Sequence, residues 1–213
     1  MAPKHLSAGE RREQVMDAAR ALFLERGYER TTIDDVLNAV GIAKGTLYHH
    51  FSGKEAIMEA IVTRTTDQLV ARAEKAAAAC AGQPAITRFL TILGAARASE
   101  EDIELAQQFR SPDNLRFHLL SMTQAYTRLV PILTTIVEEG VEAGELSTPD
   151  PRSSVEVVLA AGLTVLDGGI FPPVDALAPD TRERRQAEVL RALALLLGAD
   201  PHLVPTPQAG TPA

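Results

Sequence analysis

Apolar residues recur along most of the chain at intervals of three and four, the spacing that places them on one face of an α-helix. The strict alternation of apolar and polar residues that marks a half-buried strand is not evident. We therefore expect an all-α protein. The pattern and its glycine and proline breaks predict helices at residues 10–26, 33–40, 44–51, 54–79, 84–98, 100–110, 112–144, 151–169 and 181–198.

The most informative segment covers residues 31–55 and has the pattern of a helix-turn-helix. Thr32 and Asp35 have the spacing of a capping box, in which a hydroxyl and a carboxylate satisfy free backbone N–H groups at a helix start. Gly41 is expected to end that helix, because glycine enters the left-handed conformation without steric cost. The next helix begins soon afterwards, at Lys44. In such a motif the second helix commonly enters the major groove of DNA.

The second of these helices carries side chains suited to DNA. Lys44 and Thr46 lie in its first turn, where exposed N–H groups already favour phosphate. Tyr48 and His50 fit two roles equally well, since they could brace the core or contact DNA. Phosphate contacts would fix the register, and contacts to base edges would supply sequence preference. The candidate DNA-binding residues are Arg11, Thr31, Thr32, Lys44, Gly45, Thr46, Tyr48, His49, His50 and Lys54.

A much longer helix is predicted to follow. Ser52 and Glu55 have capping-box spacing at its start. At 1.5 Å per residue this helix reaches about 35–40 Å, which is enough to couple two domains mechanically. The expected organisation is a DNA-binding domain at residues 10–55, a second helical domain at 56–199 and disordered tails at 1–9 and 200–213.

Residues 10–60 resemble the DNA-binding domain of the TetR family of transcriptional regulators. The resemblance is carried by Val15-Met16-Asp17-Ala18-Ala19, Leu22-Phe23, Gly27-Tyr28, Thr31-Thr32-Ile33, Val40-Gly41, the run 44–51 and Lys54-Glu55. Ala43 departs from the pattern, because the family often has a helix-capping serine there. The resemblance implies a C-terminal domain that senses small molecules and a four-helix dimer interface built from the last two helices of each subunit.

The net charge of −7 is unusual for a protein that binds DNA, but the charge is unevenly distributed. Residues 1–54 carry a net charge of +1, and residues 55–213 carry −8. The acidity therefore lies outside the predicted DNA-binding domain. Even so, a charge of +1 is modest, so we expect nonspecific DNA affinity to be low and strongly salt-dependent.

Other classes of function lack their signatures. The sequence has no G-x-S-x-G elbow, no Walker loop and no G-x-G-x-x-G motif. His49 and His50 are adjacent, so they diverge on a helix and lack the i, i+4 spacing of a metal-binding pair. The single cysteine, Cys80, excludes an intramolecular disulfide. With no signal-peptide pattern and no apolar run that could span a bilayer, we expect a cytoplasmic non-enzyme without cofactor or metal.

The stretch 112–144 is apolar on more than one face, which is typical of a helix buried in the centre of a domain. Pro131 removes a backbone donor and is expected to kink or break this helix. His118, Met122 and Tyr126 share one stripe, which fits core packing or a ligand pocket with few polar groups. The TetR resemblance favours the pocket. The candidate effector-binding residues are Phe89, Phe109, Arg110, His118, Met122 and Tyr126.

The last two predicted helices suggest an assembly surface, although the same residues would also complete a monomeric core. Two-fold pairing is the usual way for a helix-turn-helix to gain specificity. The resemblance also implies a dimer through these helices. The candidate interface residues are Val155, Val158, Leu159, Leu163, Leu166, Leu190, Leu193, Ala194 and Leu197.

These patterns lead to one hypothesis with three alternatives. We expect a TetR-like, homodimeric repressor that binds a palindromic DNA operator and is released by a small-molecule effector. The chain could activate transcription instead, or its second domain could bind a partner protein rather than a small molecule. A third alternative is a purely structural dimerisation protein whose DNA-binding domain has lost its function.

Overall fold

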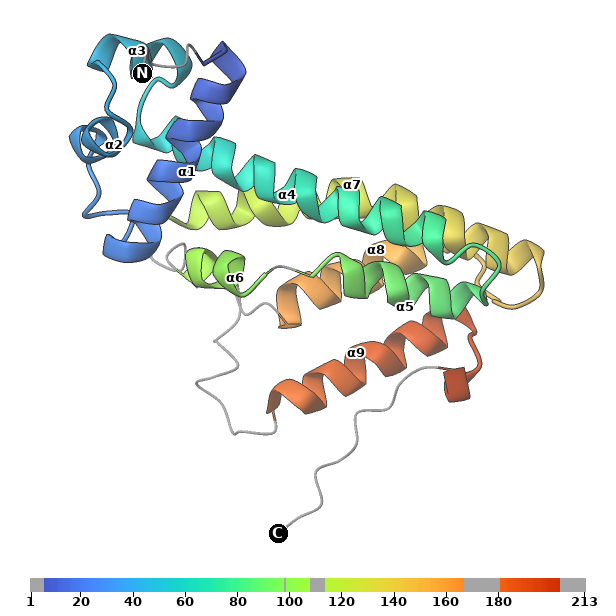
Figure 1. Ribbon diagram of the computed structural model, residues 1–213. Helices are drawn as coiled ribbons and strands as arrows, with labels where there is room; N and C mark the ends of the chain where they lie inside the picture. The colour runs from blue at the N-terminus through green and yellow to red at the C-terminus, as the bar shows by residue number, and fades with distance from the viewer. Residues whose placement is uncertain (1–5, 98, 108–113, 167–180, 204–213) are drawn as a thin grey trace. The chain divides into compact units, whose positions relative to one another are not determined.

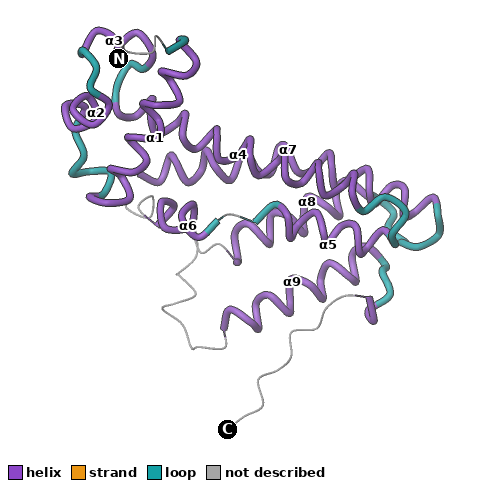
Figure 2. Tube along the Cα trace, viewed as in Figure 1, coloured by secondary structure: helices purple, strands orange, loops and turns teal. Residues whose placement is uncertain are grey.

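A computed structural model describes residues 6–97, 99–107, 114–166 and 181–203. Every regular element in these ranges is helical, which confirms the all-α prediction (Figure 1; Figure 2). The α-helices are α1 (Ala8–Arg26), α2 (Ile33–Val40), α3 (Lys44–His50), α4 (Lys54–Ala79), α5 (Ala85–Ala95), α6 (Glu100–Gln107), α7 (Leu115–Glu142), α8 (Pro151–Ala161) and α9 (Thr181–Leu197). A π-helical turn, Gly162–Leu166, follows α8. None of the described helices has both the length and the apolar composition that crossing a bilayer requires.

Local signals set the starts of the first two helices. Both begin with a capping box, formed by Ser7 with Glu10 and by Thr32 with Asp35. The hydroxyl and backbone N–H of Thr32 both donate to the Asp35 carboxylate, at 2.6 and 2.8 Å. These hydrogen bonds, that of the hydroxyl foremost, hold the pKa of Asp35 below its ordinary value. Gly41 ends α2 in the left-handed conformation, with φ of 72°.

The chain folds into two compact units, of which the first comprises residues 1–67 and 98–121. Apolar side chains of α1 to α4 share its core with Leu105 of α6 and Phe117 of α7, which are 4% and 0% exposed. The ring of Tyr28 makes edge-to-face contacts with Phe23 and Phe117, at centroid distances of 5.2 and 5.4 Å. The core beneath the helix-turn-helix therefore includes residues far beyond the boundary expected at residue 55.

An ion-pair cluster also ties α6 to α1 within the first unit. The guanidinium of Arg20 reaches Glu101 at 2.7 Å and Asp102 at 2.9 Å. The side chains of Arg20 and Asp102 are mostly buried, so solvent and salt weaken this ion pair less than they weaken the exposed pairs. The polar contact and the buried Leu105 together hold α6 against α1.

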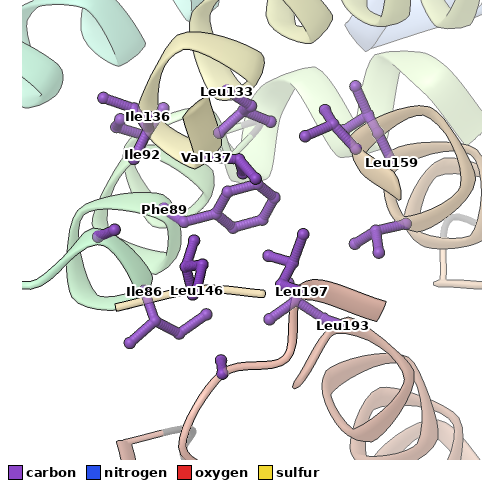
Figure 3. Packing of buried hydrophobic residues seen from close by; sticks show 14 of the residues in the cluster. Ile86, Phe89, Ile92, Leu133, Ile136, Val137, Leu146, Leu159, Leu193 and Leu197 are labelled. Carbon is purple, nitrogen blue, oxygen red and sulfur yellow. The ribbon is translucent and has the colours of Figure 1, made fainter. Parts of the chain in front are cut away.

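The second unit comprises residues 68–97 and 122–213. Figure 3 shows its core, in which Phe89 of α5 lies among aliphatic side chains from α7 and α9. Leu133, Val137, Leu193 and Leu197 are, like Phe89, at most 1% exposed. This unit is a packed helical core whose only fully buried aromatic residue, among those described, is Phe89.

The helix α7 has two positions that depart from simple helix rules. It continues through Pro131 without interruption, so the break considered from the sequence does not occur. Gly140 is required by close packing against α5, because an added Cβ would lie 2.5 Å from the Cβ of Ala85. The same Cβ would lie 2.8 Å from Leu146. Both distances are too short for carbon atoms in contact.

Candidate nucleic-acid interface

Helix α3 is anchored on one side and open on the other. Leu47 is fully buried in the core of the first unit, and Phe51, the residue that ends the helix, is 3% exposed. These two apolar side chains fix which side of α3 faces outward. The outward side presents the exposed residues Lys44, Gly45, Thr46, Tyr48 and His49.

The outward side combines a cation, a hydroxyl and flat rings. Lys44 Nζ lies 5.9 Å from the centroid of the Tyr48 ring, so the ammonium and the phenol share one face of the helix. The rings of His49 and His50 meet edge-to-face at 5.2 Å, and His50 is partly buried. Lysine and hydroxyl groups commonly bind phosphate, and phenol and imidazole groups can hydrogen-bond to base edges. A helix that enters a groove of duplex DNA needs polar and flat groups of these kinds on its outward side.

Two predicted flanking residues also have accessible polar groups. Arg11, near the start of α1, is partly buried and donates to Gln14 on the same helix at 2.6 Å. Thr32 is exposed and caps α2. Both positions are compatible with the phosphate contacts expected from the sequence.

Thr31 and Lys54 have contacts inside the first unit instead. Thr31 is 1% exposed, and its hydroxyl donates to the carbonyl of Gly27 at 2.9 Å and that of Leu22 at 3.3 Å. Lys54 Nζ donates to the carbonyl of Tyr28 at 2.8 Å and lies 4.2 Å from the centroid of its ring. Burial therefore corrects the expectation that the Thr31 side chain contacts DNA. The ammonium of Lys54 is used to hold the turn after α1.

The structure adds a polar contact that the sequence pattern missed. Arg116 of α7 forms an ion pair with Glu55 of α4 at 2.7 Å. Hydrogen bonding from Arg116 lowers the pKa of the Glu55 carboxyl. This pair directs Glu55 toward α7 and away from the capping box expected with Ser52. The partners lie far apart in sequence, so no local spacing could have indicated the contact.

A second missed contact reaches the end of α3. Arg12 Nη1 donates to the carbonyl of His50 at 3.1 Å. The guanidinium carbon of Arg12 also lies 4.3 Å from the centroid of the Phe51 ring. Arg12 therefore contacts the C-terminal end of α3 from within the same unit.

Comparison with known proteins identifies the family. The family model for bacterial regulatory proteins of the tetR family matches residues 15–61, which contain the whole helix-turn-helix. The transcriptional repressor KstR2 of Rhodococcus jostii RHA1 is 32% identical over 154 residues, covering 70% of this chain and 72% of that protein. The chain belongs to the TetR family. It is accordingly a DNA-binding transcriptional regulator.

Solved TetR-family structures have the same fold. A regulator of Mesorhizobium loti assigned to this family has a TM-score of 0.65 at 16% identity, with 90% of this chain and 98% of that chain covered. RolR in complex with resorcinol has a TM-score of 0.58 at 19% identity, with 91% of this chain and 90% of that chain covered. At these identities the likeness concerns the fold alone.

The residues expected to bind an effector have different environments. Phe89 is fully buried in the packed core of the second unit (Figure 3). Met122 and Tyr126 of the same unit are partly buried. His118 belongs to the first unit and is 7% exposed. The other two candidates, Phe109 and Arg110, lie outside the described residues. The ring of Phe89 fills part of that core, and its contact with an effector stays a prediction.

The expected dimer-interface residues are mostly core residues of the second unit. Leu163 and Leu190 are partly buried at its edge, and the side chain of Leu166 lies outside the described part. Side chains already covered within one copy cannot form the surface of contact with another. The interface expectation is therefore corrected for Val155, Val158, Leu159, Leu193, Ala194 and Leu197, whose exposed fractions do not exceed 7%.

Proposed function

We propose that this TetR-family chain is a homodimeric repressor that binds a palindromic operator through α3 of each subunit and is released by a small-molecule effector. The observation that carries the proposal is the outward side of α3, where Lys44, Thr46 and Tyr48 project from a helix anchored by Leu47. The sign of regulation is supported by the relative from Rhodococcus jostii, which is named a repressor.

The DNA contacts follow from the chemistry of that side. Lys44 and the Thr46 hydroxyl bind phosphate and set the register, while Tyr48 and His49 reach base edges. Gly45 lets the backbone of α3 approach the DNA closely, since it has no side chain. The proposed DNA-contacting residues are Arg11, Thr32, Lys44, Gly45, Thr46, Tyr48, His49 and His50.

Selection of duplexes from a random pool with the intact protein tests this function. We expect an inverted repeat whose half-site centres are separated by about one helical turn, or a multiple of it. Lys44→Ala and Tyr48→Ala should weaken binding to the selected duplex without changing thermal stability, because both side chains are exposed. Lys75→Ala, at an exposed position of α4 in the second unit, is the control. Wild-type affinity in the Lys44 and Tyr48 variants would argue against these contacts.

The homodimer is supported by apolar side chains that α8 and α9 leave uncovered, which we call the outer face. Leu195 is 74% exposed and Val157 is 56% exposed. Large apolar side chains with this exposure are typical of surfaces that a partner subunit covers. Close approach of another helix is favoured by the small side chains of Ala160 and Ala192, both exposed. The outer face comprises Val157, Ala160, Ala192, Leu195 and Leu196.

Light scattering at micromolar concentration tests the dimer. Wild type should have the mass of two 22.9 kDa chains. Leu195→Glu should give the mass of one chain, because a partner subunit would have to bury an unpaired carboxylate. Ile103→Glu, at a 48% exposed position of α6, should remain dimeric. A monomeric wild type would contradict this part of the proposal.

A small-molecule effector is supported by the structural neighbour RolR, which was solved with resorcinol. Partly buried Met122 and Tyr126 are the described candidates for contacting it. An effector that prefers a conformation with the wrong spacing between the two α3 helices would lower operator affinity. A coupling of about 1–3 kcal/mol is typical of such linkage. Native mass spectrometry of the protein from its own host should detect a bound small molecule, and its removal should tighten binding to the selected duplex.

A further inference from the structure

We propose that Arg12 is a positioning residue for α3, holding the carbonyl end of this helix in the orientation that DNA reading requires. The inference rests on the proposed role of α3. Arg12 contributes two contacts from α1: its Nη1 donates to the carbonyl of His50 at 3.1 Å, and its guanidinium carbon lies 4.3 Å from the centroid of the Phe51 ring. His50 is the last residue of α3, and Phe51 ends it.

Helix α3 needs such a contact because it is intrinsically weak. It has seven residues, whereas isolated helices shorter than about 12–15 residues are marginal in water. Ala43 at its start supplies no side-chain hydrogen bond, and Gly45 in its first turn lowers helix propensity. The last carbonyls of any helix lack partners within that helix. Arg12 satisfies one of them, and its positive charge is favourable at the negative end of the helix dipole.

The neighbouring arginine provides an internal comparison. Arg11 donates to Gln14 within its own helix, so it takes no part in holding α3. The guanidinium of Arg12 is instead directed at His50 and Phe51, both in the first unit. Arg11 is therefore the arginine proposed to contact phosphate, and Arg12 is the one that orients the reading helix.

The two roles have different signatures in DNA binding. Loss of a phosphate contact weakens binding to all sequences and reduces the slope of log affinity against log salt by about one. Loss of a positioning contact leaves the number of phosphate contacts unchanged. It weakens binding to the preferred sequence, because base-edge contacts depend on the orientation of α3. Binding to an unrelated sequence should then change little.

The experiment uses the intact protein and two duplexes of equal length: the sequence that wild type selects from a random pool, and a scrambled version of it. Affinities are measured between 50 and 200 mM salt. Arg12→Gln should weaken binding to the selected duplex by about 100-fold, since the proposed dimer loses an oriented contact of about tenfold in each subunit. The salt slope and the affinity for the scrambled duplex should stay at their wild-type values. Arg11→Gln should reduce the slope by about two, because the proposed dimer loses one phosphate contact in each subunit, and it should weaken binding to both duplexes.

Arg12→Lys keeps the positive charge and N–H donors but not the planar guanidinium, so it should recover part of the lost affinity. If Arg12→Gln does not fold, the affinity and salt slope of Arg12→Lys serve as the test. A variant at Arg12 that reduces the salt slope and weakens both duplexes equally would overturn the proposal in favour of phosphate binding. Wild-type affinity and slope in both Arg12 variants would overturn it as well.

A measurement without DNA separates this inference from the proposed function. In hydrogen exchange of the free protein, Arg12→Gln should speed exchange in residues 44–51 and leave residues 85–95 of the second unit unchanged. Arg12→Lys should give an intermediate rate in residues 44–51. If wild type selects no duplex, the proposed reading of DNA fails, and exchange alone decides whether Arg12 holds α3. Unchanged exchange in residues 44–51 of both variants would refute the role of Arg12.

Discussion

Replacing Phe117 with alanine tests whether the start of α7 belongs to the core that supports the helix-turn-helix. The Phe117 side chain is fully buried, and its ring meets Tyr28 edge-to-face at 5.4 Å. Truncating a buried phenylalanine to alanine costs about 3–5 kcal/mol, through lost burial and the cavity left behind. Loss of the aromatic pair is expected to contribute about 0.5–1.5 kcal/mol of this.

The magnitude can be expressed as a population. At about 1.36 kcal/mol per factor of ten, this loss raises the opened fraction of the first unit by about 150- to 5,000-fold. Hydrogen exchange followed by mass spectrometry measures the change directly. Residues 15–23 of α1 and 57–62 of α4 should lose protection, because their apolar side chains share the core with Phe117.

A neighbouring residue supplies the control. Leu119 lies on the same helix but is 47% exposed, so Leu119→Ala should change stability by no more than about 0.5 kcal/mol. If Phe117→Ala and Leu119→Ala give equal protection in α1, the start of α7 does not support the first unit and the reasoning is refuted.

Gly140→Ala should lower the free energy of unfolding by about 1–3 kcal/mol, since the new Cβ would lie 2.5 Å from that of Ala85. Gly94→Ala, in α5, meets nothing within 4 Å and should raise that free energy by about 0.4–1 kcal/mol. Urea denaturation followed by circular dichroism compares the two, and equal midpoints would contradict the packing argument. The pKa of Asp35 is lower in the folded protein than its ordinary value of 3.8, so its ionised carboxylate stabilises the fold at pH values above 3.8. This stabilisation is lost as the pH falls through the folded-state pKa. Asp35→Asn should remove that part of the pH dependence in thermal unfolding below pH 5, whereas an unchanged profile would show that the cap with Thr32 does not stabilise the fold.

Signals that act within three or four residues predicted the local structure well. The spacing of Thr32 and Asp35 indicated the capping box at the start of α2, and Gly41 indicated its end. These predictions succeeded because each depends on the geometry of a single helix turn, which the sequence specifies directly.

Contacts between distant segments could not be predicted in this way. The sequence gives no local reason for Phe117 to meet Tyr28, since the two are brought together only by tertiary packing. The same holds for Arg12 and the carbonyl of His50. The helix α9 shows that periodicity alone does not predict which side chains are exposed. Leu193 is 1% exposed and Leu195 is 74% exposed, although both are leucines of one amphipathic stretch. Periodicity located the helix but did not determine which leucines its own core would cover.

The first unit is assembled from two separated stretches of chain, residues 1–67 and 98–121. A gene fragment that stops after residue 67 would lack Leu105 and Phe117, which complete the apolar interior beneath the helix-turn-helix. The unit that contains the helix-turn-helix is consequently not a contiguous segment that can be separated by truncating the chain at one position. A hybrid made by grafting residues 1–67 onto another protein must supply two apolar side chains of similar volume, because the graft would otherwise contain a cavity in its core.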